Sequence, residues 1–190
     1  MTMEDHVNNV CKASYHQIRL LGKLRKFLSK EAAAMITHAF VTSRLDYCNS
    51  LLYGISKSLA AKLQRVLNCA ARIVSRTKSS SHITPVLKSL HWLPVAQRCV
   101  FKTALLTFKA VHGLAPSYLC ELINYRASRD LRSLNDVLLD VPRCTSSCGS
   151  RAFVISAPTL WNSLPYDVRS CSTLTCFKSK LKTYLFSVAF

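Results

Sequence analysis

The segment Leu59–Arg76 places its apolar and its basic residues on different sides of one helix. At 100° per residue, its lysines and arginines fall within an arc of about 80°. These residues are Lys62, Arg65, Arg72 and Arg76. The adjoining sector is apolar and consists of Leu59, Leu63, Val66, Leu67, Ala70, Ile73 and Val74. Such a segment must cover its apolar sector with other helices and leave its basic arc for water or for an anionic partner.

A second amphipathic segment runs from about Glu4 to Leu28. Its apolar side holds Val7, Val10, Ile18, Leu21 and Leu28. Between residues 12 and 26, four cations and one histidine share another arc of about 80°. The residues of this arc are Lys12, His16, Arg19, Lys23 and Lys26. No acidic residue interrupts either basic arc.

A further helix is expected between these two segments. Ser29 is a suitable N-cap for it, and a carboxylate at Glu31 suits the positive end of the helix dipole. The helix carries Met35, Ile36, Ala39, Phe40 and Leu45, and it ends near Gly54. Ser58 is expected to cap the helix 59–76. Because short connections join antiparallel neighbours, residues 1–76 are expected to form an antiparallel three-helix bundle.

The rest of the chain divides into a helical region, 77–125, and a less regular region, 126–190. Proline is favoured at helix starts, where its missing N–H is not needed. Pro85, Pro94 and Pro116 are therefore expected to open helices, the longest of which starts at Pro94 and ends at Gly113. The fold class that we expect is mainly α.

Residues 126–190 are expected to form a small irregular part. Short strands are predicted at Val137–Val141 and at Phe153–Ile155, and a one-turn helix from Pro158 to Trp161. Ser172 is the expected N-cap of a final helix. Its inward residues are Leu174, Phe177, Leu181 and Leu185, and Lys178, Lys180 and Lys182 lie mostly outward.

The charge of the chain indicates the class of its partner. Twenty-six lysines and arginines oppose nine acidic residues, which gives a net charge of +17, while 49% of the residues are hydrophobic. Such an excess of cations favours a polyanion, most simply nucleic acid. The candidate contacts are Lys12, Arg19, Lys23, Lys26, Lys62, Arg65, Arg72 and Arg76. The alternative is that both arcs are only solvated helix faces.

The cysteines admit two interpretations. There are nine, no signal peptide is visible at the N-terminus, and we expect free thiols inside the cell, in the nucleus or cytoplasm. Cys144 with Cys148 and Cys171 with Cys176 could form two zinc-ligand pairs, but both spacings are looser than a two-residue knuckle. We therefore expect no metal and no other cofactor. No apolar run reaches the roughly 18 residues of a membrane span.

Catalytic motifs are not evident. Glu4-Asp5 at the N-terminus is the one adjacent acidic pair of the sequence, which has no glycine-rich phosphate loop and no small-residue elbow around a serine. Asp46 is expected to be a structural, hydrogen-bonding acid. Metal-dependent phosphoryl transfer needs converging carboxylates, and nine scattered acids do not suggest such a site.

Five ordered strings resemble the region that follows the polymerase palm in reverse transcriptases of non-LTR retrotransposons (LINEs), of the jockey-like and chicken-repeat-like kinds. They are SRLDYCNSLLYG (Ser43–Gly54), KLQRVLNCAAR (Lys62–Arg72), LKSLHWLPV (Leu87–Val95), FKAVHGLAP (Phe108–Pro116), and RAF (Arg151–Phe153) with APTLWNSLP (Ala157–Pro165). The resemblance covers essentially the whole chain.

The resemblance implies a helical thumb, with a C-terminal extension, that grips the template–primer duplex. The catalytic Tyr/Phe-x-Asp-Asp turn of that family has no counterpart here, so the resemblance implies a non-catalytic part of an RNA-directed DNA polymerase. Its partners would be an RNA or DNA duplex and the palm and fingers of the polymerase. In relatives the segment before Arg151 is basic, whereas Cys144–Gly149 is neutral here. The alternative is a helical interaction protein that docks an acidic protein.

Overall fold

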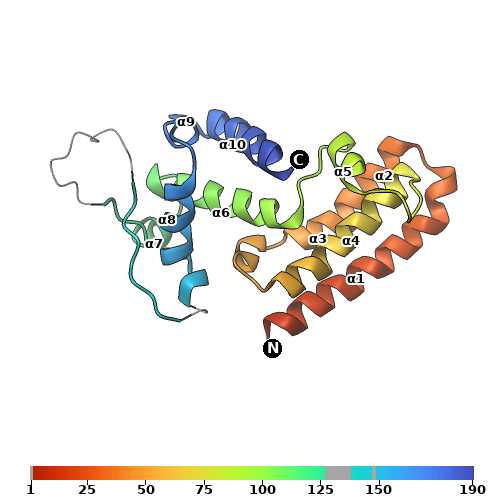
Figure 1. Ribbon diagram of the computed structural model, residues 1–190, viewed down its shortest axis with the longest axis horizontal. Coiled ribbons are helices and arrows are strands. Elements are labelled where there is room, and N and C mark those ends of the chain that lie inside the picture. Colours follow the sequence, from red (N-terminus) through yellow and green to blue (C-terminus); the bar gives the residue numbers. More distant parts are fainter. Residues whose placement is uncertain (1, 127–137, 147–148) are drawn as a thin grey trace. The chain divides into compact units, whose positions relative to one another are not determined.

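The computed structural model describes residues 2–126, 138–146 and 149–190, and these residues are mainly helical, as expected (Figure 1). The chain forms two compact units. The first consists of Met1–Asn49, Ile55–Arg98 and Ala189–Phe190, and the second of Ser50–Gly54 and Cys99–Val188. The first unit therefore includes part of the region 77–125.

The first unit is built on two long helices, α1 (Met3–Leu24) and α4 (Lys57–Ser75). Thr2 and Asp5 cap the start of α1 reciprocally, because the Thr2 hydroxyl accepts the Asp5 N–H and the Asp5 carboxylate accepts the Thr2 N–H. A 3₁₀ turn, η1 (Arg25–Phe27), follows α1. The predicted extent of the first helix is thus confirmed to within one turn.

The segment between α1 and α4 is one helical path with a change of pitch. Ser29 caps α2 (Lys30–Thr37) through a 3.1 Å bond from the Ala32 N–H, as predicted. A π-helical turn, η2 (His38–Thr42), and α3 (Ser43–Asp46) continue it, and η3 (Asn49–Leu52) follows. A π turn adds a residue and so rotates the part of the helix that follows it. Before the turn Ala33 is buried and Met35 is exposed. From the turn onward Phe40 is exposed, while Val41 and Leu45 are buried.

The expected N-cap of α4 was wrong by two residues. The Ser56 hydroxyl accepts the Leu59 N–H at 3.4 Å, and Ser58 lies in the first turn with its hydroxyl against that of Ser56. The apolar sector of α4 is buried as predicted at five positions. They are Leu63, Val66, Leu67, Ala70 and Val74.

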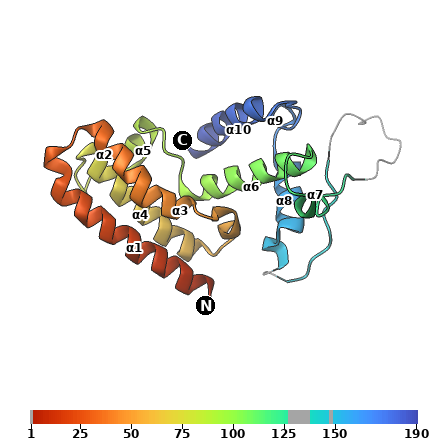
Figure 2. The same ribbon diagram turned by 180° about the vertical axis from the view of Figure 1, so that it is seen from behind.

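α1 and α4 run parallel, side by side (Figure 2). Lys62, near the start of α4, contacts Glu4 and Asn8 near the start of α1. At the other ends, Arg25 donates to the carbonyls of Ile73 and Val74. The segment from α2 to α3 runs in the direction opposite to α1, and α4 runs in the same direction as α1. Consecutive helices are therefore antiparallel, as predicted, and the first and third are parallel.

The first unit is completed by α5 (Thr84–Ser89), with Pro85 at its start, and by the beginning of α6 (Val95–Val111) directly after Pro94. α6 continues into the second unit. It ends at Val111, two residues before Gly113, whose φ of +66° is the left-handed conformation that glycine adopts without strain. The predicted helix starts at Pro85 and Pro94 are confirmed, as is the predicted stop of the long helix at Gly113.

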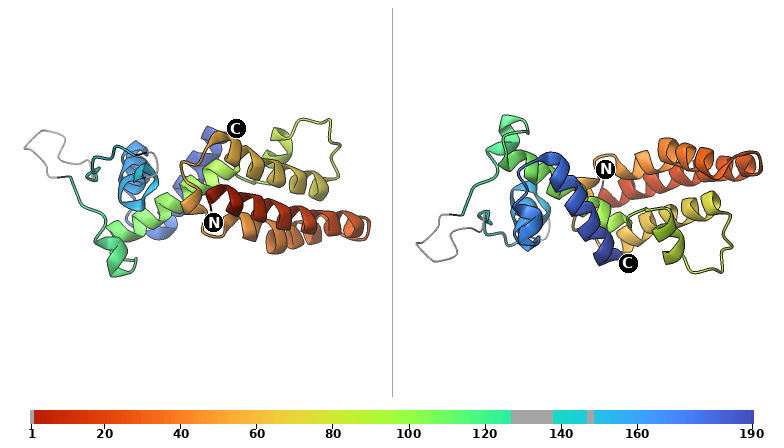
Figure 3. Two further views of the ribbon diagram at one scale, coloured as in Figure 1. Left: turned by 90° about the horizontal axis from the view of Figure 1, so that it is seen from below. Right: turned by 90° about the horizontal axis from the view of Figure 1, so that it is seen from above.

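The second unit also contains α7 (Ser117–Cys120), η4 (Gly149–Arg151), α8 (Phe153–Ser163), α9 (Tyr166–Arg169) and α10 (Leu174–Ala189). Phe108 of α6, Trp161 of α8 and Phe177 of α10 are fully buried and their rings pack together. Figure 3 shows the three helices that carry them. Phe177 lies 4.3 Å from Phe108 and 5.9 Å from Trp161, measured between ring centroids. Leu181 and Leu185 are buried beside them, as predicted for the last helix.

The strand predicted at Phe153–Ile155 was wrong, since these residues form the first turn of α8. β-branched and aromatic residues favour strands, but Ala157, Leu160 and Trp161 follow at helical spacing and are buried. Pro158 lies inside α8 and does not start a helix. Its ring is buried, and burial of this face outweighs the single intrahelical hydrogen bond that proline removes.

Two smaller expectations in the second unit also changed. Of the predicted strand Val137–Val141, Val137 lies outside the described residues, and Leu139 forms an isolated bridge with Tyr125, which is too little for a strand. The N-cap of α10 is Thr173, one residue after the predicted Ser172, because the Thr173 hydroxyl accepts the Cys176 N–H. Lys178, Lys180 and Lys182 are exposed, as expected.

Candidate nucleic-acid interface

The basic arc of α1 is open to solvent. Lys12, His16, Arg19, Lys23 and Lys26 are all exposed. Arg19 donates from Nε to the Tyr15 carbonyl one turn earlier, at 3.4 Å, and the Lys26 ammonium lies 4.8 Å from the centre of the Phe27 ring. In the part of the chain that the structure describes, none of these five side chains pairs with a carboxylate. The arc therefore keeps its charge available.

The basic arc of α4 is mostly engaged within the protein. Lys62 donates to Glu4 at 3.2 Å and to Asn8 at 3.0 Å, so it links the starts of α4 and α1. Arg72 donates from Nη1 to the carbonyls of Lys78 and Ser81, both at 2.8 Å, and thereby holds the loop after α4. Arg65 is exposed and makes no ion pair among the described residues.

Arg76 does not continue the helical arc, because α4 ends at Ser75 and Arg76 has a left-handed backbone with φ +55°. Its Nη2 donates to the carbonyls of Arg25 and Lys26 at 3.0 and 3.5 Å. Arg25 in turn donates to Ile73 at 3.0 Å and to Val74 at 2.8 Å. Arg25 thus caps the C-terminal end of α4, and Arg76 caps η1 at the end of α1. A cation is favourable at both places, because the C-terminal end of a helix is the negative end of its dipole.

Sequence reasoning missed Arg25. A cation near the end of a helix is a sequence signal for C-terminal capping. However, the carbonyls that Arg25 binds come from α4, 48 and 49 residues later. No spacing rule along one helix predicts such partners.

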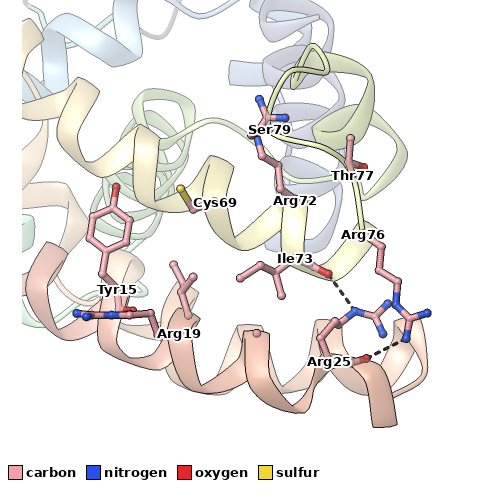
Figure 4. A pocket seen from close by; sticks show the side chains of 11 residues that line it. Tyr15, Arg19, Arg25, Cys69, Arg72, Ile73, Arg76, Thr77 and Ser79 are labelled. Carbon is pink, nitrogen blue, oxygen red and sulfur yellow. Dashed lines mark hydrogen bonds between the residues drawn. The ribbon is translucent and has the colours of Figure 1, made fainter.

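A groove of about 740 Å³ lies between α1 and the C-terminal half of α4 (Figure 4). Arg19 and Tyr15 stand at one end of it and Arg25 with Arg76 at the other, and Ile73 lies between them. The remaining lining residues are Ile18, Gly22, Cys69, Arg72, Thr77 and Ser79. The groove joins the open arc of α1 to the engaged arc of α4, since Arg19 belongs to both the arc and the groove.

Four arginines and no acidic residue are among the side chains that line the groove. Burial raises the pKa of the Cys11 thiol, although Lys62 and Arg65 act in the opposite direction. Burial, followed by the neighbouring Cys69 and Cys11, also raises the pKa of the Tyr15 hydroxyl. Both groups are therefore neutral at pH 7. Along the sequence, no acidic residue occurs between Asp5 and Glu31 or between Asp46 and Glu121.

Asp46 has a structural role. Its carboxylate accepts from Arg98 at 2.6 Å and from Asn49 at 3.3 Å. Arg98 also donates to the Leu93 carbonyl. The ion pair between Asp46 and Arg98 connects α3 to the start of α6. Asp46 belongs to the string Ser43–Gly54 that resembles the reverse transcriptases.

No metal site is evident among residues 2–126, 138–146 and 149–190, where no three His, Cys, Asp or Glu side chains converge. Cys171 and Cys176 are neighbours, with 3.4 Å between their sulfurs; Cys171 is buried and Cys176 is exposed. Cys148 lies outside the described residues. In the same three ranges, no helix has both the length and the apolar character needed to span a bilayer.

No family model matches the chain, and neither does any curated protein or solved structure.

Proposed function

We propose that the first unit binds the backbone of a nucleic-acid duplex, without catalysis, through the exposed arc of α1 together with Arg65. The observation that carries the proposal is that Lys12, Arg19, Lys23 and Arg65 are exposed and pair with no carboxylate of the residues that the structure describes. Cations one helical turn apart can follow successive phosphates, and their binding releases counterions. Such contacts fix position and carry no base preference.

The resemblance to non-LTR reverse transcriptases supports a specific setting for this activity. We propose that the chain corresponds to the thumb and C-terminal extension of such a polymerase and holds an RNA–DNA or DNA duplex. The string Lys62–Arg72 lies on α4, which forms one wall of the groove, and carries Arg65. Palm and fingers of the same polymerase are the expected protein partner, in the nucleus or cytoplasm.

Only some of the predicted contact residues are suited to a direct test. Lys62, Arg72 and Arg76 hold α1, the loop after α4 and η1 in place, so replacing them would change stability together with binding. Within the described ranges, Lys12, Arg19, Lys23 and Arg65 make no such tertiary contact. Gln is nearly as good a helix former as Lys or Arg, so these four can be replaced without loss of the helices.

The test compares two fourfold variants by fluorescence anisotropy with a labelled blunt RNA–DNA hybrid. One changes Lys12, Arg19, Lys23 and Arg65 to Gln. The matched control changes four other exposed lysines to Gln and removes the same charge. They are Lys57, Lys88, Lys178 and Lys182. The first variant is expected to lose at least about tenfold in affinity at moderate salt, and the control to change little.

An acidic peptide decides between nucleic acid and a protein partner. Under the proposal, polyglutamate displaces the hybrid only weakly, since its charges lack the spacing of a duplex backbone. Equal loss of binding in both fourfold variants would show that net charge alone acts and would contradict the proposal. Preferential binding of polyglutamate through the α1 arc would favour the acidic-protein alternative and would contradict the proposal as well.

A further inference from the structure

The groove between α1 and α4 has an apolar floor, which contact with the phosphates of a duplex would not require. Its floor is apolar, with buried Ile18 and half-buried Ile73 facing a helix position that has no side chain, Gly22. A Cβ added to Gly22 would lie 3.8 Å from the Ile73 Cδ1, which is ordinary van der Waals contact. Glycine at position 22 therefore leaves space beside Ile73, which a methyl group would narrow only slightly and a larger side chain would fill.

Two arginines beside this floor, Arg72 and Arg76, are held in place by hydrogen bonds within the protein. Arg72 is held by two loop carbonyls through Nη1, and Arg76 by two carbonyls of η1 through Nη2. Nε of both residues and the remaining terminal nitrogens have no partner in the described residues. A guanidinium already immobilised loses little side-chain entropy when it binds an anion. Ser79 lies beside Arg72 (Figure 4).

An apolar floor next to oriented cations fits a flat, weakly polar group that carries an anion. We infer that the groove holds an unpaired nucleotide of the bound nucleic acid, with its base on Ile18, Gly22 and Ile73 and its phosphate against Arg72 or Arg76. This inference rests on the proposed function. The groove of about 740 Å³ falls within the ordinary range of small-ligand pockets and is ample for one nucleotide.

Continuity with the proposed duplex interface favours a nucleotide over other anionic ligands. Arg19 lines the groove and also belongs to the exposed arc with Lys12 and Lys23. A strand whose phosphates follow α1 therefore reaches the groove without leaving basic surface. Grooves that bind single strands generally combine cations along the backbone with an apolar or aromatic surface under the bases.

The experiment compares a blunt RNA–DNA hybrid with the same hybrid that carries a short unpaired tail. Wild-type protein is expected to bind the tailed hybrid at least about fivefold more tightly. Gly22→Leu fills the groove without removing a charge, so it should abolish the advantage of the tail and leave the affinity for the blunt hybrid unchanged. Gly22→Ala, which the space allows, is the matched control and should keep the advantage.

Other outcomes separate this inference from the proposed function. If the blunt hybrid binds and the tail adds nothing in wild-type protein, the inference is wrong and the proposed function stands. If neither hybrid binds, both the inference about the groove and the proposed function are wrong. If circular dichroism shows that Gly22→Leu has lost helix, Ile73→Gln serves in its place. Binding of sodium oleate to the free protein, abolished by the groove-filling variant while the tail has no effect, would instead assign the groove to an anionic amphiphile.

Discussion

The two units of the protein hold their helices together by different means. In the second unit, Phe108, Trp161 and Phe177 form a closed aromatic cluster in which all three side chains are fully buried. In the first unit, the ends of α1 and α4 are joined by Arg25 and Arg76, and a groove remains between the helices. A closed cluster stabilises and offers nothing to a ligand. A pair of helices joined by arginines leaves cations and apolar surface open.

The aromatic cluster predicts the largest effect of a single substitution. Phe177→Ala should lower the free energy of unfolding of the second unit by about 3–5 kcal/mol, because a cavity replaces a ring that contacts two others. Trp92 lies in the first unit and Trp161 in the second. Urea unfolding followed by Trp161 fluorescence in a Trp92→Phe background therefore reports the second unit. Tyr166→Ala, at a half-exposed ring, should cost about 0.5 kcal/mol or less.

A loss below about 1 kcal/mol for Phe177→Ala would be too small for a filled core position. It would mean that the second unit does not depend on the cluster. The contrast between the two units would then have no energetic basis.

The arginine caps predict a smaller effect in the first unit. Arg25→Gln removes charge-assisted bonds to Leu28, Ile73 and Val74, and should lower the free energy of unfolding by about 2 kcal/mol. The measurement is urea unfolding followed by Trp92 fluorescence in a Trp161→Phe background. Arg19→Gln is the matched control, since among the described residues Arg19 donates only to a carbonyl of its own helix. Equal stability of the two variants would contradict the cap.

A pH effect of the first unit is the smallest that we expect. Burial, followed by the charge of Arg98, lowers the pKa of His38 below 6.5, and the nearby Asp46 opposes the shift only in part. The unfolded chain then binds more protons than the folded chain, so stability is full above pH 6.5 and falls as the pH drops through and below that value. His38→Gln should flatten this fall.

The midpoint of the Trp92 transition, measured against pH, checks the prediction for His38. Trp161 serves as the internal control, because the second unit does not contain His38. Stability of the first unit that rises on acidification would reverse the expected sign.

The sequence predicted the helices well because apolar periodicity decides which segments are helical and which side they bury. Val7, Ile18 and Leu21 are buried in α1, and Leu63 and Val74 in α4, as the pattern indicates. The pattern was insufficient where burial competes with local propensity. Phe153–Ile155 has a strand-like composition but begins α8, because the buried residues after it repeat at helical spacing.

The site was predicted only in part, because helical angles say which residues share a face and not what that face meets. Lys12, Arg19, Lys23 and Arg65 are exposed as expected, whereas Arg76 turns toward α1 because its backbone is left-handed. Ile73 was placed in the apolar sector of α4, and it lines the groove opposite Gly22. A three-helix bundle implies that α1 and α4 are parallel, but the positions at which the two helices meet do not follow from the pattern of either one.

The salt dependence of hybrid binding tests most directly the claim that α1 and Arg65 contact a phosphate backbone. On a duplex, the logarithm of the binding constant falls with the logarithm of salt concentration by about 0.9 for each phosphate neutralised. Changing Lys12, Arg19, Lys23 and Arg65 to Gln is therefore expected to flatten the slope by roughly 0.9 for each phosphate that the variant no longer neutralises, to about the same extent for any sequence. The matched control variant should keep the slope of the wild-type protein. An unchanged slope in the first variant would contradict the account and leave both basic arcs as solvated helix faces.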